Sequence, residues 1–98
     1  MTVLVEDTRW ILQLEGDCGM ASAAELKERL MDGLQAAREI ELDLRAAREI
    51  DVAVLQLLWA AVRAAASQQL PVVCRWSEYA SAIARQAGFD GFSAPAPE

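Results

Sequence analysis

Residues 39–76 read EIELDLRAAREIDVAVLQLLWAAVRAAASQQLPVVCRW, and this segment has the most regular pattern of the chain. Apolar and polar residues alternate over residues 40–45, which indicates a half-buried strand. A turn then ends at Asp51, a candidate N-cap, and residues 52–69 contain no Gly or Pro and are rich in Ala and Leu, which favour a helix. Pro71 opens a short β-branched run that predicts another strand. The order predicts a βαβ unit, in which two parallel strands lie under one helix.

The predicted helix has a narrow polar side. Between residues 52 and 67 the polar residues are Gln56, Arg63 and Ser67, which are spaced by seven and four. At about 100° per residue they project within roughly 40° of one another, so the rest of the helix surface is expected to pack inward. Trp59 lies beside this polar stripe. We interpret it either as an anchor for a partner or as a cover for the flank of a small core.

The N-terminal part of the chain predicts two strands and a helix. Residues 2–6 and 10–15 alternate and are expected to pair as a hairpin, followed by a loop over residues 16–19. Ser22 and Glu25 have the spacing of a capping box, and helical periodicity follows. This helix leads into the βαβ unit.

The C-terminal part predicts a third helix that starts at Ser77. Gly88 is expected to end it in the left-handed conformation, and Phe89 to pack back against it. The predicted element order is therefore β-β-α-β-α-β-α, an α/β fold. We expect a single domain over residues 1–93 and a flexible tail over residues 94–98.

Composition and charge limit the possible functions. The chain has 98 residues, 54% of them hydrophobic, which is enough for the core of one domain. The net charge of −6 and the pI near 4.6 argue against a nucleic-acid or anionic-membrane partner. Histidine is absent, which removes the commonest metal ligand and the usual acid–base group near neutral pH.

The cysteines and apolar segments point to a cytoplasmic protein. Cys18 and Cys74 have no metal-binding spacing, and Cys74 lies in a predicted strand, which favours a buried thiol over a disulfide. The first residues lack the pattern of a signal peptide. The longest apolar run, over residues 52–62, is too short to insert into a bilayer as a spanning helix.

Catalytic chemistry finds little support in the sequence. The single lysine, Lys27, falls on the polar side of the first predicted helix. Glu39, Glu41 and Asp43 share one face of a predicted strand, where solvated carboxylates are a more common arrangement than an acid–base pair. The glycines of the 16–19 loop match neither the P-loop nor the dinucleotide-binding fingerprint. We therefore predict a non-enzymatic protein without a catalytic residue, cofactor or metal.

At the level of the whole chain the pattern resembles the STAS domain family, which includes bacterial anti-sigma-factor antagonists and the cytoplasmic tails of sulfate transporters. The resemblance covers residues 3–92 and rests on the segments LEGDCGMASAAELKERL, IELDLRAAREID, VAVLQLLWAAVRAA, PVVCRW and SEYASAIARQAGF. It implies a mixed sheet with helices packed chiefly on one face.

The resemblance also indicates where such a protein is regulated. Antagonists of the family carry an Asp, two small hydroxyl residues and a Gly where the strand turns into the second helix, and a partner kinase phosphorylates the second hydroxyl. This chain has Asp51, Val52, Ala53 and Val54 there. Ala53 has no oxygen to accept a phosphate, so phosphorylation at the usual position is not expected.

From the resemblance and the helix pattern we expect partner binding through one patch, with the alternative that these residues only seal the end of the helix. The expected partner is a kinase-like anti-sigma factor or a chemotaxis-linked signalling protein. The alternatives are the ATPase of an ABC-type lipid transporter, to which the chain would be an accessory STAS subunit, and a nucleotide-binding regulatory role. The sequence does not decide whether the chain forms a homodimer. The patch comprises Asp51, Val52, Ala53, Gln56, Trp59 and Arg63.

Overall fold

The structure is a computed structural model, and it describes residues 1–36 and 38–88. The described residues form the predicted order β-β-α-β-α-β-α, with a short 3-10 helix, η1, added before the first α-helix. The elements are β1 (Thr2–Val5), β2 (Arg9–Cys18), η1 (Met20–Ser22), α1 (Ala23–Gln35), β3 (Glu39–Ile50), α2 (Val52–Ser67), β4 (Val72–Arg75) and α3 (Glu78–Gln86).

The strands form one mixed sheet in the order β1-β2-β3-β4. β1 runs antiparallel to β2, whereas β2, β3 and β4 are parallel to one another. Val3, Leu12, Leu42 and Cys74 lie opposite one another in register and form one row across the sheet. The predicted hairpin and the predicted βαβ unit are both confirmed.

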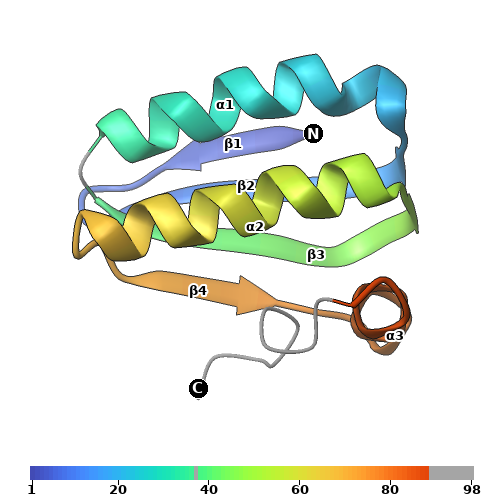
Figure 1. Cartoon of the computed structure of the whole chain (residues 1–98). Coiled ribbons are helices and arrows are strands. Elements are labelled where there is room, and N and C mark those ends of the chain that lie inside the picture. Colours follow the sequence, from blue (N-terminus) through green and yellow to red (C-terminus); the bar gives the residue numbers. More distant parts are fainter. Residues whose placement is uncertain (37, 89–98) are drawn as a thin grey trace.

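The helices cover the sheet unequally. α1 and α2 lie side by side over one face, and α3 lies beyond the end of β4, where it contacts β3 (Figure 1). This confirms the expected mixed sheet with helices chiefly on one face. The largest fully buried side chains come from both layers and are Leu12, Leu14, Leu26, Leu42, Leu44, Val54, Leu55 and Leu58.

The ends of the later helices follow the sequence prediction. The Asp51 carboxylate accepts a hydrogen bond of 2.8 Å from the Ala53 amide, and the Ser77 hydroxyl accepts one of 3.0 Å from the Ala80 amide. Gly88 has a φ of 92°, as expected for a glycine that ends a helix. The predicted contact of Phe89 and the predicted tail over residues 94–98 lie outside the described residues.

The predicted capping box at Ser22 is wrong. The Ser22 side chain makes no capping hydrogen bond, and its φ and ψ of −89° and −6° are helical. An N-cap side chain reaches the free amides from an extended backbone conformation. Because η1 already turns the chain before α1, Ser22 does not have that conformation.

Two strands are longer than the sequence predicted. β2 continues to Cys18 through the expected loop, and β3 continues to Ile50 through the expected turn. The pairing register between these strands shifts after Gln13 and again after Gly16, and β3 has one extra residue at each shift. These shifts are β-bulges, which strengthen the twist of a strand without ending it.

The bulges explain why the sequence predicts a turn at the end of β3, where the structure has a strand up to Ile50. The core-facing residues of β3 are two apart up to Leu44, but then they are three apart, at Ala47 and Ile50. A spacing of three does not match strand periodicity. Gly16, opposite this part of β3, has a φ of 65° that glycine adopts without strain.

Candidate partner-binding surface

The start of α2 lies at the carboxyl ends of two parallel strands. β3 ends at Ile50, and Asp51 has the extended backbone of an N-cap, with φ −78° and ψ 150°. The Asp51 amide donates a hydrogen bond of 3.0 Å to the Cys18 carbonyl at the end of β2. The cap is therefore attached to the sheet on one side and to α2 on the other.

We call the start of α2, residues 51–53, the corner, and its side chains are at least partly exposed to solvent. Val52, the first residue of α2, is 49% exposed, and Asp51 and Ala53 are half-buried. Gln56 and Arg63 are exposed further along the helix. The predicted polar stripe is thus on the surface, and it begins at the corner.

Trp59 has an intermediate position. It is half-buried and packs against the hydrophobic core. The indole therefore covers the flank of the core and also keeps part of its surface exposed. With Gln56 three residues before it and Arg63 four residues after it, Trp59 borders the exposed side of α2.

A hollow of about 260 Å³ lies beside the helix start. Its lining includes three acidic residues, Asp17 from β2, Glu49 from β3 and the cap Asp51. The Arg48 guanidinium approaches the Asp17 carboxylate to 4.0 Å, at the outer limit of an ion pair. The local charge is negative, so this hollow suits a cationic side chain of a partner.

Two exposed apolar residues near the corner were missing from the predicted patch. Met20, in η1, is 70% exposed, and Tyr79, at the start of α3, is 43% exposed and lines the acidic hollow. η1 packs against α2. Met20 follows a glycine within the expected loop, which was a weak signal of exposure. Nothing local in the sequence indicated that Tyr79 would reach the same place.

The predicted solvated face of β3 is wrong for Glu41 and Asp43, whereas Glu39 is half-buried. Glu41 is 6% exposed and Asp43 is 7% exposed. Glu41 forms ion pairs with Arg9 at 2.9 Å and Arg75 at 3.0 Å. A buried carboxylate needs such partners because desolvation of an unpaired charge is costly.

Asp43 is paired within its own strand. It accepts hydrogen bonds from the Arg45 side chain, at 2.8 and 3.0 Å, and from the Arg45 amide. The hydrogen bonds from the Arg45 guanidinium hold the pKa of Asp43 below its ordinary value, against the opposing effect of burial. Glu41 and Asp43 each face cations, which is the geometry of structural ion pairs and not of a shared-proton acid pair.

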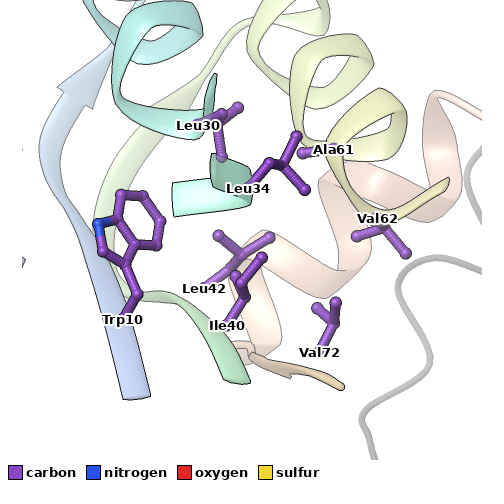
Figure 2. Close-up of a pocket in the computed structure, with 8 residues that line it drawn as sticks. All are labelled: Trp10, Leu30, Leu34, Ile40, Leu42, Ala61, Val62 and Val72. Carbon is purple, nitrogen blue, oxygen red and sulfur yellow. The ribbon is translucent and has the colours of Figure 1, made fainter. Parts of the chain in front are cut away.

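The void between the helices and the sheet is too small for a small-molecule ligand. A void of about 10 Å³ lies between the helices and the sheet, and its lining is apolar (Figure 2). Ligand pockets commonly measure ~300–1,000 Å³. In residues 1–36 and 38–88, no three His, Cys, Asp or Glu side chains are placed so that they could hold a metal ion together. Within the same residues, no helix has the length and apolar composition that crossing a membrane requires.

Both cysteines are buried free thiols, as expected for Cys74. Burial raises the pKa of the Cys74 thiol to about 11 and also raises that of Cys18. A thiol with a raised pKa is a poor nucleophile near neutral pH. Neither thiol is therefore expected to react readily in the folded protein.

The comparison with protein families is decisive for the identity of the fold. The family model described as "Mlab, STAS domain" matches residues 1–94. The chain is a STAS domain of this family. A comparison with curated proteins finds no significant match.

Solved structures agree with this assignment. The STAS domain superposes on a protein from Thermotoga maritima, described as a candidate anti-sigma factor antagonist, with a TM-score of 0.77 and 17% identity, covering 92% of this chain and 80% of that one. It superposes on the unphosphorylated anti-sigma factor antagonist SpoIIAA with a TM-score of 0.76 and 11% identity, covering 92% and 82%. At these identities the likeness establishes the fold.

A third similar structure is a much longer protein. Mglu matches with a TM-score of 0.69 and 25% identity over 79% of this chain. The STAS domain described here corresponds to 19% of the Mglu chain. The same fold thus occurs both as most of a chain and as a small part of one.

Proposed function

We propose that this STAS domain acts by binding another protein through the start of α2. The proposed surface joins Asp51, Val52, Ala53, Gln56, Trp59 and Arg63 to the acidic hollow beside them. The observation that supports it best is the exposure of Val52, at 49%, directly beside the acidic hollow. Trp59 and Arg63 of the same surface are residue types that are enriched among binding hot spots.

The proposed role is in bacterial signalling, as an anti-sigma-factor antagonist or in a chemotaxis-linked system. The fold shared with two anti-sigma factor antagonists supports this role. The chain acts in the cytoplasm as a regulator and not as an enzyme. Its partner is a kinase-like anti-sigma factor or a chemotaxis signalling protein.

Phosphorylation at the start of α2 is not part of the proposed mechanism. Ala53 occupies the position at which the resemblance places the phospho-acceptor, and a methyl side chain has no oxygen to modify. A phosphate there would alter docking through its charge at the helix N-terminus. Without that switch, affinity depends on contact alone.

A second candidate is an accessory subunit on the ATPase of an ABC-type lipid transporter. The missing hydroxyl at residue 53 favours it, because a permanently bound subunit needs no switch. Nucleotide binding is the least supported alternative, since Asp17, Glu49 and Asp51 would repel phosphate groups at the hollow.

The test is affinity purification of the tagged full chain from its host, with identification of bound proteins by mass spectrometry. Val52→Asp introduces a charge where it is exposed, and an acidic residue in the first turn of a helix is favourable. We therefore expect Val52→Asp to keep the fold and to lose the partner. Trp59→Ala is less selective, because Trp59 also packs against the core.

The matched control is Gln35→Glu, which adds the same charge at the exposed end of α1. It should retain the partner that the unaltered chain binds. Recovery of the same partner with Val52→Asp, at the same yield, would refute the proposed surface. The identity of the partner distinguishes a signalling protein from a transporter ATPase.

A further inference from the structure

A second surface of the domain lies on the outer side of the helix layer. α1 and α2 pack side by side (Figure 1), and a groove of about 210 Å³ runs between them. We call this the α1–α2 groove and define it by Lys27, Met31 and Leu34 from α1 and Leu57, Ala60 and Ala64 from α2. None of these residues belongs to the surface proposed above.

The α1–α2 groove is apolar and open. Met31 is 50% exposed, and Ala60 is also exposed. Ala60 and Ala64 have short side chains, so a partner side chain can approach the backbone of α2 closely. The lining of the groove spans eight residues along each helix, which is about two helical turns. Two turns of a third helix match this length, whereas most small-ligand pockets are larger, at ~300–1,000 Å³.

The charged side chain that lines the α1–α2 groove is opposite in sign to the net charge of the chain. Lys27, Met31 and Leu34 are spaced by four and three, so they share one side of α1. The acidic residues Glu25, Glu28 and Asp32 share another side, roughly 125° away at about 100° per residue. The charged residue in the lining of the groove is therefore a cation, although the chain has a net charge of −6.

We propose that the α1–α2 groove binds an amphipathic helix of a partner protein. The bound helix presents large apolar residues at positions i, i+4 and i+7 to the groove, and it carries carboxylates beside them, of which one faces Lys27. An apolar helix face in a groove is an established mode of recognition, and the cation in the lining selects an acidic sequence. This surface is additional to the function proposed at the start of α2.

The probe is a designed helical peptide of about 18 residues, a length at which isolated helices become stable enough to study. It has Leu at i, i+4 and i+7 and Glu along both flanks, and a matched peptide has Lys in place of Glu. Binding to the full chain is measured by fluorescence anisotropy. The Glu-flanked peptide should bind at least about tenfold more tightly than the Lys-flanked one.

Variants in the chain test the location. Ala60→Glu places a charge in the groove and should weaken binding of the Glu-flanked peptide by more than about tenfold. Ala66→Glu is the matched control, because Ala66 is also exposed on α2 but lies on the side away from α1. It should bind as the unaltered chain does. Lys27→Glu should reverse the preference between the two peptides.

The proposal is overturned if neither peptide binds, if Ala60→Glu and Ala66→Glu bind alike, or if Lys27→Glu leaves the preference unchanged. It is also overturned if sedimentation shows a dimer that Ala60→Glu dissociates, since the occupant would then be a second copy. Val52→Asp should leave peptide binding intact. A negative result for the surface at the start of α2 and a negative result for the α1–α2 groove are therefore distinguishable.

Discussion

The ring of Trp10 lies directly against the backbone of α1 at Gly33. A Cβ atom added to Gly33 would come within 2.6 Å of the Trp10 ring atom Cε3. Both residues are buried, with Trp10 only 4% exposed. A glycine within a helix is normally a weakness, but here it allows the helix to approach the sheet closely.

Gly33→Ala therefore tests whether packing or helix propensity dominates at this contact. Propensity alone would stabilise the helix by about 1 kcal/mol. The clash should outweigh this gain and lower the free energy of unfolding by about 1–3 kcal/mol, as for other overpacked cores. The measurement is urea unfolding followed by tryptophan fluorescence.

Gly19→Ala serves as the control for Gly33→Ala. A Cβ atom at Gly19 meets nothing within 4 Å, and its φ of −92° suits any residue. This variant should unfold within about 0.5 kcal/mol of the unaltered chain, as most surface substitutions do. A Gly33→Ala chain as stable as the Gly19→Ala chain would contradict the packing argument.

Single-residue predictions from sequence succeeded where the cause was local. The caps at Asp51 and Ser77 were found because both residues stand between an extended segment and a helix. The cap at Ser22 failed because an unforeseen 3-10 turn precedes it. The role of Gly33 was not visible either, since it depends on Trp10, which is 23 positions away in the sequence.

At the level of elements, β3 combines a regular half with a bulged half. Its regular half, up to Leu44, was predicted from alternation. Its second half was missed because the bulges move core residues to a spacing of three. The same strand holds Asp43, whose carboxylate is neutralised by Arg45 two residues later.

The Asp43–Arg45 pair predicts a specific dependence of stability on acid. Because the folded-state pKa of Asp43 is lowered, its contribution to stability is complete above the ordinary aspartate value of about 3.9. It is lost as the pH falls from there through the lower folded-state value. Asp43→Asn should lower stability at pH 7 by about 1 kcal/mol and should make stability fall less steeply below about pH 4.

Urea unfolding at a series of pH values from neutral to acidic measures this effect. Asp32→Asn, at an exposed position of α1, removes the same charge and controls for the change of net charge alone. An Asp43→Asn variant with the original slope below pH 4 would show that the pair does not contribute.

At the scale of the whole molecule, the corner is assembled from segments that are far apart in the sequence. The sequence predicted its α2 residues, because they follow one another along a helix. It could not predict that Asp17 and Tyr79 would line the hollow beside them, because β2 and α3 reach the corner through tertiary packing. The family resemblance gave the architecture correctly, but the surroundings of the corner required coordinates.

The thiol of Cys74 reports on the integrity of the entire domain. It lies in the core side of β4, and its pKa of about 11 leaves little thiolate near pH 8. Iodoacetamide should therefore label Cys74 in native buffer far more slowly than a free cysteine. Labelling should accelerate over the same urea range in which fluorescence shows unfolding.

Peptide mapping by mass spectrometry separates labelling of Cys74 from labelling of Cys18, which serves as an internal comparison. Rapid modification of Cys74 in native buffer would mean that β4 opens without unfolding of the rest. The expected result is one cooperative unit, as for most small domains.

The hydrogen bond from the Asp51 amide to the Cys18 carbonyl has a further consequence for recognition. It joins the helix cap to a neighbouring strand, so the proposed contact residues at the start of α2 are held by the sheet. A preorganised surface loses little conformational entropy when it is occupied. If the proposed surface binds a partner, moderate affinity can come from a small contact area, and the rate of release would be governed by that contact and not by refolding of a loop.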